Sequence, residues 1–461
     1  MRSIRFLALG ICCLALAAAG CRRPGSGKER GPSRGGGVVS DRAAVLATLS
    51  EENAPPAPRS PPGLGLHAPF DPSPEFTFSS LGGGVVYLAE KGGQFQVFHN
   101  GRAGRPYGAV GDLTISPDGR RTAYGVVTGG RWRMVVDGEE SKDYLAIQSP
   151  QFSPDSAHLA YRAMVGDRWF LVVDGKENGG TSTRYLDLAF VAGSSRVAYL
   201  ESAQGEDRGP LLLADLALKN PVVVAPDVTQ LVTNADGSRI AAVAVTPEGQ
   251  RVLTFEVGKP TEIARGASFE AVSGLAFGPD GVAVTYVGER AGKSYVVLDG
   301  KEEPYPANVM MGPPLVLPDG KGAMALMWLN GTVRLYRFFA AAGPPGPIYA
   351  EAEGLVVSDD GKLHAYAARR GEKWLLVVNG VEGPELDRVV GPSFSPDWKY
   401  VVYRARQDGK RFVVIADPGA KTLRQHAAYE RVYPPMFTAD GKSVAYGVKA
   451  GKQLAWKVEP L

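Results

Sequence analysis

From about residue 76 onward, apolar residues come in short runs separated by glycine, proline and aspartate, and helical periodicity is weak throughout. Residues 148–187 are representative. QFS runs into a Pro-Asp turn, HLAYRAMV precedes the tight turn GD, RWFLVVDG ends in Asp-Gly, and STRYLD follows. Short runs rich in β-branched and aromatic residues, bounded by such turns, predict strands. We therefore expect four short strands in this stretch.

The same pattern recurs along the chain. SPDG at Ser116–Gly119 returns in related form near residues 153, 234, 278, 317, 358, 395 and 438, and five of the intervals between successive aspartates are 37 to 43 residues. In most copies a Tyr follows the Asp by six residues, then come an aromatic residue and an Asp or Asn, as in Tyr124, Trp132 and Asp137. About ten units of about 40 residues fill residues 76–461.

Four short strands per period predict the blades of a β-propeller. Runs such as AYGVV and FLVV are apolar on both faces, which suits a sheet covered by a neighbouring blade on each side. The expected fold class is all-β, a propeller of about 8–10 four-stranded blades, with two smaller consecutive propellers as the alternative. The last unit ends at Leu461 after about three strands. A strand near Phe76–Ser79 is expected to complete it and close the ring.

With these motifs in register, residues 76–461 resemble the TolB-like, WD-related propeller repeats that carry a Ser-Pro-Asp-Gly motif. The resemblance implies the propeller fold. It implies little about function, because propellers host many activities. TolB itself has an additional N-terminal α/β domain that this chain lacks, so its partners are not carried over.

Residues 1–20 have the features of a bacterial signal peptide: MRSIR is basic, and Phe6–Gly20 is an apolar run too short for an ordinary membrane span. The following Cys21 completes a segment that resembles the lipobox of bacterial lipoproteins, although Ala18 stands where that family usually has Leu. The resemblance implies cleavage before Cys21 and lipidation of its thiol, and Arg22 after it implies sorting to the outer membrane. An ordinary signal peptide with a chance Cys is the alternative.

Residues 21–75 are rich in Gly, Pro and Arg and are expected to be a tether, because such segments cannot bury a core. Within it, DRAAVLATLSEEN is expected to form a short helix with Asp41 as N-cap. The predicted organisation is a lipoprotein signal peptide at 1–20, a tether at 21–75 and a propeller at 76–461.

Composition excludes several classes of function. The net charge is only +3 over 461 residues, which gives no electrostatic case for nucleic-acid binding. The three cysteines, Cys12, Cys13 and Cys21, all lie near the N-terminus, so the repeat region has no disulfide or thiolate chemistry. The five histidines lie at unlike positions, and neither HExxH nor GxSxG occurs.

The repeated aspartates are the most tempting site residues, but copies spread around a ring cannot converge on one metal ion. We expect Asp118 and its equivalents to shape turns by accepting hydrogen bonds from backbone N–H groups. Tyr124, Trp132, Trp169 and Trp374 are expected to pack within and between blades, with sugar stacking as the alternative. No catalytic, cofactor-binding or metal-binding residue is predicted, and no cofactor is implied.

The leading hypothesis is a lipid-anchored propeller of the bacterial cell envelope, on the periplasmic or surface face of the outer membrane. It would be a non-catalytic module or scaffold that binds an envelope protein or a peptidoglycan-associated partner. The alternative is a propeller enzyme, a glycan-active hydrolase or lyase with a site in a central funnel. Any site should lie where the copies differ from one another.

Overall fold

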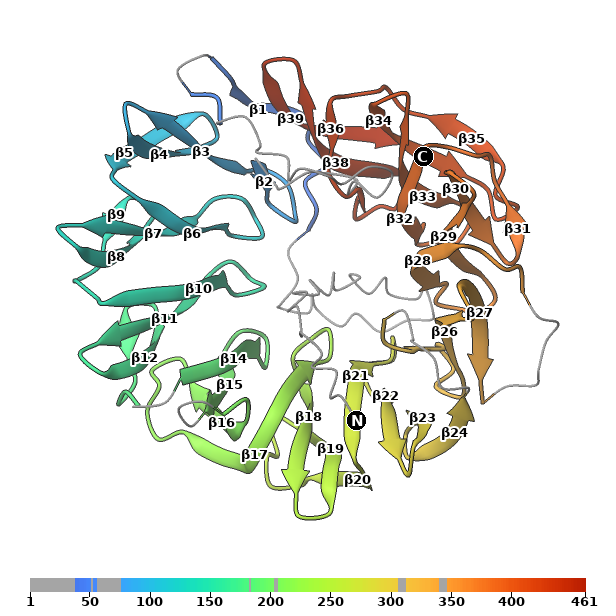
Figure 1. Ribbon diagram of the computed structural model, residues 1–461. Coiled ribbons are helices and arrows are strands. Elements are labelled where there is room, and N and C mark those ends of the chain that lie inside the picture. Colours follow the sequence, from blue (N-terminus) through green and yellow to red (C-terminus); the bar gives the residue numbers. More distant parts are fainter. Residues whose placement is uncertain are drawn as a thin grey trace, which may run out of the picture.

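The computed structural model describes residues 38–50, 53–55, 76–181, 184–202, 206–305, 312–339 and 346–461, with the side chains of 184–186 excepted. All regular secondary structure in these ranges is β-strand. The strands form small antiparallel sheets arranged in one ring (Figure 1). The all-β propeller is therefore confirmed, and the chain does not form two separate smaller rings.

Most blades contain four antiparallel strands in chain order. Blade 3 has the order β10-β11-β12-β13, from Ala146–Phe152 through Leu159–Val165 and Arg168–Val173 to Lys176–Glu177. The sequence pattern suggested that STRYLD is its fourth strand, and this prediction is wrong. Asp174 and Gly175 both have positive φ, which turns the chain back immediately, so β13 follows at once. Residues 184–187 instead begin β14 of the next blade.

Ten blades follow one another, because nine sheets are present among the described residues and the seven-stranded one contains two blades that share β17. Blade 1 consists of β2 (Phe76–Phe78), β3 (Val85–Lys91), β4 (Gln94–His99) and β5 (Arg102–Tyr107), and blade 2 of β6 (Val110–Ile115), β7 (Thr122–Thr128), β8 (Arg131–Val136) and β9 (Glu139–Glu140). Blade 4 consists of β14 (Arg184–Val191), β15 (Arg196–Ser202), β16 (Gly209–Asp215) and β17 (Val222–Thr233). Blade 5 shares β17 and adds β18 (Arg239–Thr246), β19 (Gly249–Glu256) and β20 (Ala264–Phe269).

Blade 6 consists of β21 (Ala271–Phe277), β22 (Val284–Arg290), β23 (Lys293–Leu298) and β24 (Lys301–Tyr305), and blade 7 of β25 (Leu315–Val316), β26 (Ala323–Leu329) and β27 (Thr332–Phe338). Blade 8 consists of β28 (Glu351–Val357), β29 (His364–Arg370), β30 (Lys373–Val378) and β31 (Val381–Glu382). Blade 9 consists of β32 (Arg388–Phe394), β33 (Val401–Gln407), β34 (Lys410–Ala416) and β35 (Thr422–Gln425). Blade 7 has three strands within the described ranges.

Blade 10 combines the two ends of the described chain. Its strands are β36 (Arg431–Val432), β37 (Met436–Phe437), β38 (Ser443–Ala450), β39 (Gln453–Pro460) and β1 (Ala44–Thr48). The outermost strand β1 runs antiparallel to β39, with Ala44 opposite Trp456 and Thr48 opposite Gln453. Strand β1 thus closes the ring from within the range expected to be a tether, and the folded part of the chain begins N-terminal to residue 76.

Two sequence predictions about closure are wrong. Part of the segment expected to be a helix capped by Asp41 forms β1, in which a register shift between Val45 and Ala47 lets Ala47 be buried while Val45 stays exposed. The strand near Phe76–Ser79 does not complete the last blade. Phe76–Phe78 is β2, which pairs with β3 and starts blade 1. The indole Nε1 of Trp456 donates to the carbonyl of Ser40 at 3.1 Å and adds to the closure.

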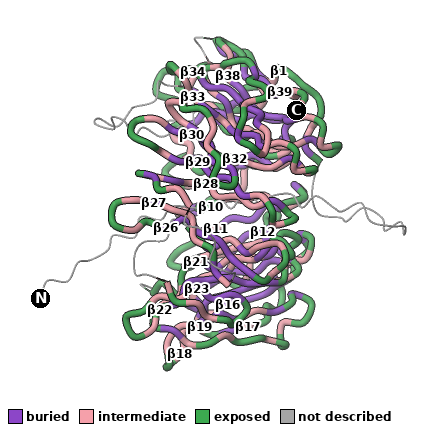
Figure 2. The backbone as a smooth tube through the Cα atoms, turned by 90° about the vertical axis from the view of Figure 1, so that its right-hand side faces the viewer, coloured by how far each residue is buried: buried purple, intermediate pink, exposed green. Residues whose placement is uncertain are grey.

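The core lies in the interfaces between neighbouring blades. Tyr124 of blade 2 is buried with Val97 of blade 1, and Trp132 packs against the cluster around Tyr161 of blade 3. Trp169 and Trp374 occupy equivalent clusters between blades 3 and 4 and between blades 8 and 9. The edge-on view shows buried strands with exposed turns at their ends (Figure 2). The prediction that the strand aromatics pack between blades is confirmed.

Candidate functional site

The repeated aspartates shape turns, as predicted. Ser116 Oγ donates to Asp118 Oδ1 at 2.6 Å, the same carboxylate oxygen accepts the backbone N–H of Arg120 at 3.1 Å, and Ser116 Oγ accepts that of Arg121 at 2.9 Å. The pairs Ser358/Asp360, Ser395/Asp397 and Thr438/Asp440 repeat these contacts. In each copy one carboxylate oxygen is used inside its own turn.

The second repeated position also serves the backbone. Asp137 Oδ1 accepts the N–H of Thr122, at the start of β7, at 2.8 Å. Asn100, Asp174, Asp299 and Asn379 make the equivalent bond to the second strand of their own blades. These five residues all have positive φ, which Asn and Asp tolerate better than other side chains. Their alternation between Asp and Asn fits a hydrogen-bond acceptor rather than a required charge.

The turns between first and second strands are hydrogen-bonded to one another. The N–H of Asp118 donates to Ser156 Oγ of the next blade at 3.0 Å, and the N–H of Ala192 donates to the carbonyl of Gly237 at 2.7 Å. Asn234 Nδ2 likewise donates to the carbonyl of Gly281 at 3.2 Å. We call the surface made by these first-to-second-strand turns the Asp-turn rim.

Outer-strand glutamates are also engaged in structure. Tyr107, Tyr144 and Tyr349 donate their hydroxyl hydrogens to Glu140, Glu177 and Glu382 at 2.9, 2.7 and 2.8 Å, each bond joining one blade to the next. Burial, followed by this bond to a carboxylate, raises the pKa of all three tyrosines. These three carboxylates therefore stabilise the contacts between neighbouring blades, so we assign them a structural role.

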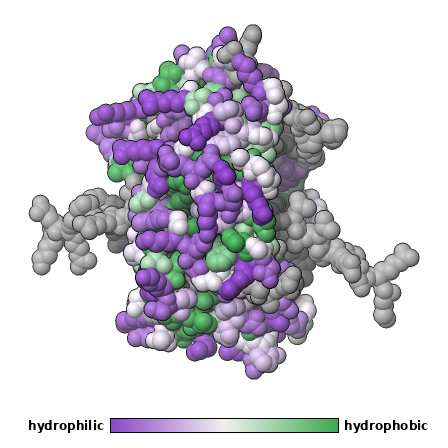
Figure 3. All heavy atoms as spheres, turned by 90° about the vertical axis from the view of Figure 1, so that its left-hand side faces the viewer, coloured by the Kyte–Doolittle hydropathy of each residue, from purple (hydrophilic) through white to green (hydrophobic). Residues whose placement is uncertain are grey.

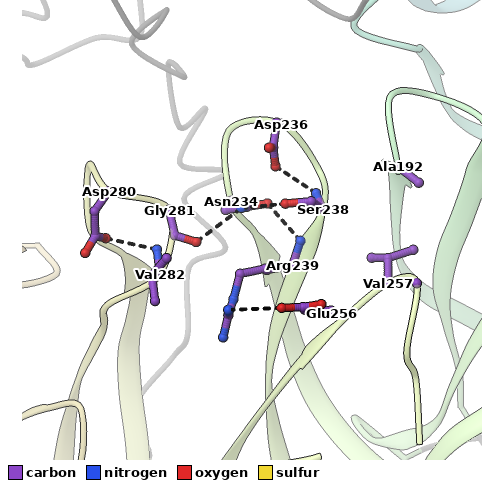
Figure 4. Close-up of a pocket in the computed structure, with 11 residues that line it drawn as sticks. Ala192, Asn234, Asp236, Ser238, Arg239, Glu256, Val257, Asp280, Gly281 and Val282 are labelled. Carbon is purple, nitrogen blue, oxygen red and sulfur yellow. Dashed lines mark hydrogen bonds and ion pairs between the residues drawn. The ribbon is translucent and has the colours of Figure 1, made fainter. Parts of the chain in front are cut away.

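A pocket of about 520 Å³ interrupts the Asp-turn rim at blades 4 to 6 (Figure 4). Its volume is in the range of small-ligand and side-chain binding pockets. The residues that line it come from two turns of blade 5 and from the rim turns of blades 4 and 6: Asn234, Asp236, Ser238, Arg239, Glu256, Val257, Gly258, Ala192, Asp280, Gly281 and Val282.

Hydrogen bonds fix the walls of this pocket. Asp236 Oδ1 accepts the N–H of Ser238 at 2.9 Å, and Asp280 Oδ1 accepts the N–H groups of Val282 and Ala283 at 2.9 and 3.0 Å. The bond from Asn234 to Gly281 joins the two turns across the blade boundary. At the base, Arg239 Nη1 lies 3.8 Å from Glu256 Oε1 (Figure 4).

The pocket contains charges of both signs. Arg239 pairs with Glu256, and Arg196 Nη1 donates to the carbonyl of Val257 at 3.1 Å. The two rim carboxylates are those of Asp236 and of Asp280, which lies on the blade 7 side of its turn, near Gly320. Neither has a Lys or Arg nitrogen within 4 Å among the ion pairs of the described ranges. Hydrogen bonds, first from Ser238 and also from Asn234, hold the pKa of Asp236 below its usual value. At neutral pH this carboxylate is therefore charged.

The other copies show what distinguishes this pocket. Two residues after the rim aspartate, several turns have an exposed base that pairs with the second carboxylate oxygen: Arg120 with Asp118 at 3.8 Å, Lys362 with Asp360 at 3.5 Å, and Lys399 with Asp397 at 3.0 Å. Lys321 and Lys442 occupy the same position in blades 7 and 10. At the pocket, Ser238 and Val282 stand there instead, and blade 3 has Ala157 at the same position.

Sequence reasoning did not identify this pocket, although it stated that a site should lie where the copies differ. The register gave a partial signal, since the residue two positions after the Asp is basic in five copies and neutral at 157, 238 and 282. What the sequence lacked was the geometry that places the turns of blades 5 and 6 around a common space.

The remaining candidate groups for chemistry are metal ligands, the histidines and Cys21. In those ranges no cluster of three or more His, Cys, Asp or Glu side chains could hold a metal ion. His99, His158, His364 and His426 belong to four different blades, and Cys21 lies outside the described residues. No helix in the described part of the chain has the length and apolar character of a membrane span.

The lowered pKa of Asp236 is the opposite of what the general acid of a glycoside hydrolase needs. Burial raises the pKa of Asp187 on β14 and of Glu201 on β15 in blade 4, and burial together with the charge of Asp360 raises that of Asp359 in blade 8. None of these three residues lines the pocket. The enzyme alternative therefore gains no support from the pocket.

Comparisons with known proteins were made at three levels. No family model matches the chain, and no curated protein matches it. Solved structures that match include a eukaryotic initiation factor (12% identity, 75% of this chain and 96% of that chain, TM-score 0.46) and a Dos1 propeller (11%, 76% and 92%, 0.39). TolB from Acinetobacter baumannii also matches (16%, 61% and 80%, 0.29). The fold assignment itself rests on the strand order and ring closure described above.

Proposed function

We propose that the protein is a lipid-anchored β-propeller of the bacterial cell envelope that binds a protein partner through the Asp-turn rim without catalysing a reaction. The observation that carries this proposal is the pocket at blades 4 to 6, where the repeated pattern of the rim is interrupted. In the copies described above, the repeated Asp, Asn and Ser side chains are used for turns. At the pocket, these turns border a depression of the surface that another molecule can enter.

The N-terminal sequence supports export and anchoring. The basic MRSIR, the apolar Phe6–Gly20 and the lipobox-like end at Cys21 are together typical of bacterial lipoproteins. Thioether-linked and amide-linked acyl chains make such an anchor durable. The outer membrane is the proposed location, on its periplasmic or surface side.

A binding role suits the surface of the ring. In the view of Figure 3, which shows the side of blades 1 to 3, hydrophilic residues predominate and hydrophobic ones form only small areas. A partner that recognises this protein by polar contacts needs a few fixed charged groups in a depression of the surface. The Asp-turn rim offers such a depression at the pocket.

The proposal is tested by cross-linking in intact cells, with a photoreactive group placed at Val282 on the pocket edge. The control position is Val165, which lies at the end of β11 in blade 3 that is opposite to the Asp-turn rim. A partner that cross-links from position 282 and not from 165, and that binds the purified mature chain saturably, is the expected result. Failure to recover any partner, together with hydrolysis of glycans or peptides by the purified protein, would overturn the proposal in favour of an enzyme.

A further inference from the structure

We propose that the outer edge of the ring at blades 9, 10 and 1 lies against the anionic phospholipid headgroups of the membrane that holds the lipid anchor. This inference rests on the anchoring in the proposed function and deepens it by stating which part of the ring faces the membrane. We call this surface the basic edge. It consists of the outermost strands β35, β1 and β5, together with Lys421 before β35 and residues 41–43 before β1.

The charge of the chain is unevenly distributed around the ring. Residues 388–461, which form blade 9 and all of blade 10 except β1, contain 13 Lys and Arg against six Asp and Glu. Residues 110–387, which form blades 2 to 8, contain 26 Lys and Arg against 35 Asp and Glu. The side chains of the two parts therefore carry net charges of opposite sign. Such a separation turns blades 9 and 10 toward an anionic surface and the other blades away from it.

The outermost strands of blades 9, 10 and 1 lie along the same part of the ring (Figure 1). Arg424 Nη1 of β35 donates to the carbonyl of Pro460 in β39, the strand that pairs with β1. On the other side of β1, Gly101 directly before β5 lies against Ala47, since a Cβ on Gly101 would be 3.5 Å from the Ala47 Cα. None of the three strands contains an acidic residue, whereas β9, β13, β24 and β31, the outermost strands of blades 2, 3, 6 and 8, each contain one or two glutamates.

Three bases of this edge are available to another molecule. Arg42 before β1, Arg102 at the start of β5 and Lys421 before β35 are exposed. Within the part of the chain that the structure describes, none of their side chains makes a hydrogen bond or an ion pair. Their charges are therefore not committed to the fold.

The carboxylates beside the basic edge do not cancel its charge. Asp41 and Asp417 adjoin β1 and β35 in the sequence, and Oδ1 of Asp417 accepts the N–H groups of its own turn. Glu140 of blade 2 lies 3.5 Å from Arg105 of β5. Against these carboxylates stand five Lys and Arg: Arg42, Arg102, Arg105, Lys421 and Arg424.

The sequence between the proposed anchor and β1 is an independent sign of an anionic membrane surface. Residues 22–37 contain five Lys and Arg against one Glu. Clusters of about four to eight Lys and Arg next to a membrane anchor bind anionic headgroups and strengthen the attachment by acyl chains. Because this segment leads to Arg42 and β1, the part of the ring next to the proposed anchor is the basic one.

Exposed apolar side chains of the basic edge favour a membrane over a soluble anion. Leu423 of β35 lies between Lys421 and Arg424 in the sequence, and its exposed fraction is 50%. Val45 of β1 has an exposed fraction of 56%. Such residues enter the boundary between headgroups and acyl chains while neighbouring bases contact the phosphates. A phosphate group in solution would gain nothing from them.

Sedimentation with vesicles tests the inference on the unlipidated mature chain, residues 21–461 with Cys21→Ser. One set of vesicles is phosphatidylcholine with about one quarter phosphatidylglycerol, and the other is phosphatidylcholine alone. We expect binding to the anionic vesicles at low salt, binding to the neutral ones that is at least ten-fold weaker, and loss of binding at about 0.5 M NaCl, where the screening length is about 4 Å. A high-salt wash therefore separates this contribution from that of the lipid when membrane fractions of cells are compared.

The edge variant is Arg42→Gln/Arg102→Gln/Lys421→Gln. Because these side chains make no contact of their own in the described ranges, the fold is expected to be preserved, which circular dichroism and thermal midpoints verify. One base next to an anionic surface strengthens binding about five-fold. We therefore expect the edge variant to bind the anionic vesicles at least ten-fold more weakly than the unmodified chain does.

The matched control is Lys176→Gln/Arg265→Gln/Lys301→Gln. It removes three exposed bases from β13, β20 and β24, the outermost strands of blades 3, 5 and 6, and changes the net charge by the same amount. Its binding should stay within about two-fold of that of the unmodified chain, since these bases face away from the membrane. Equal binding to both kinds of vesicle, no binding at low salt, unchanged binding by the edge variant, or an equal loss in the control would overturn the inference.

Cross-linking in cells separates this inference from the proposed function. A photoreactive group at Leu423 should label phospholipid, and one at Val223, which is 58% exposed on β17 of blade 4, should not. Labelling of a protein from position 423, or of nothing, would overturn the inference. If position 423 labels phospholipid but position 282 yields no protein partner, protein binding fails and the inference stands. The reverse result removes the inference and leaves protein binding in place.

Discussion

His364 is a buried histidine whose replacement tests how burial is coupled to pH in this fold. It is the first residue of β29, its side chain is buried, and its Nδ1 has no hydrogen-bond partner. Burial, with a smaller contribution from nearby Arg337, lowers its pKa from 6.5 to about 4. The equivalent residues at the start of β3, β22 and β33 are Val85, Val284 and Val401, so His364→Val copies the other blades.

The sign of the effect follows from proton linkage. In the unfolded chain His364 gains a proton below pH 6.5, whereas the folded protein keeps it neutral down to about pH 4. The unfolded state therefore binds more protons in this window, and the free energy of unfolding decreases as pH falls, by about 1.4 kcal/mol per pH unit from this residue alone. At pH 4.5 the loss amounts to about 2.5 kcal/mol relative to pH 7.5.

The variant His364→Val should abolish this loss. At pH 7.5 we expect a gain of about 1 kcal/mol, because an unpaired buried nitrogen is removed, and at pH 4.5 a gain larger by about 2.5 kcal/mol. The assay is urea unfolding at pH 7.5, 6.0 and 4.5, followed by tryptophan fluorescence. His158→Ala is the control, since His158 is paired with Asp174 at 2.6 Å and is not deeply buried. If the stabilisation by His364→Val is the same at all three pH values, the reasoning is refuted.

Three further predictions concern ring closure, the turns and the anchor. Leu49→Ala, next to β1, should lower the free energy of unfolding by about 2–3 kcal/mol in urea melts, because Leu49 is buried. Val45→Ala on the exposed edge of β1 should lower it by less than about 0.5 kcal/mol. Equal effects of the two substitutions would contradict the role of β1 in closing the ring. Asp299→Ala should cost about 1–2 kcal/mol through loss of the bond to the Val284 N–H and unfavourable positive φ, whereas Asp299→Asn should be nearly neutral in the same assay. Cys21→Ser should release the protein from the membrane fraction, and unchanged membrane association would disprove lipid anchoring.

The blades could be predicted from the sequence because each carries its own local signals. Turn residues, apolar strands and aromatics recur in every full copy, so a local misjudgement in one copy is corrected by the others. Even there the fourth strand was misplaced, since two residues such as Lys176–Glu177 are enough to form it after a tight turn. A strand this short carries no periodicity to detect.

Ring closure could not be predicted in the same way. AVLAT in β1 has no turn motif, three of its five residues are the strong helix formers Ala and Leu, and it lies in a Gly- and Pro-rich region. Its strand conformation depends on pairing with β39, which lies at the opposite end of the chain. Only the tertiary structure supplies that partner, so local propensity gave the wrong answer.

One periodic signal was present but overlooked. In blades 2, 3, 6, 8 and 9 the innermost strand is irregular at a residue four positions before the rim motif, where Asp112, Ser149, Gly274, Gly354 and Gly391 all have positive φ. Small or turn-forming residues at a fixed offset indicate a β-bulge. Recognising it would have extended the motif upstream and fixed the register of the first strand.

The positions of β1 and the pocket together constrain how the protein would meet its partner. Strand β1 lies on the outer edge of blade 10, and the pocket is formed by blades 4 to 6, which lie across the ring from it (Figure 1). With the lipid on Cys21, as proposed, the chain between Cys21 and Ala44 can span at most about 80 Å. The anchored edge of the ring is then blade 10, and the pocket lies on the far part of the ring. A partner bound at this pocket would be engaged away from the anchored edge, where a neighbouring membrane does not obstruct it.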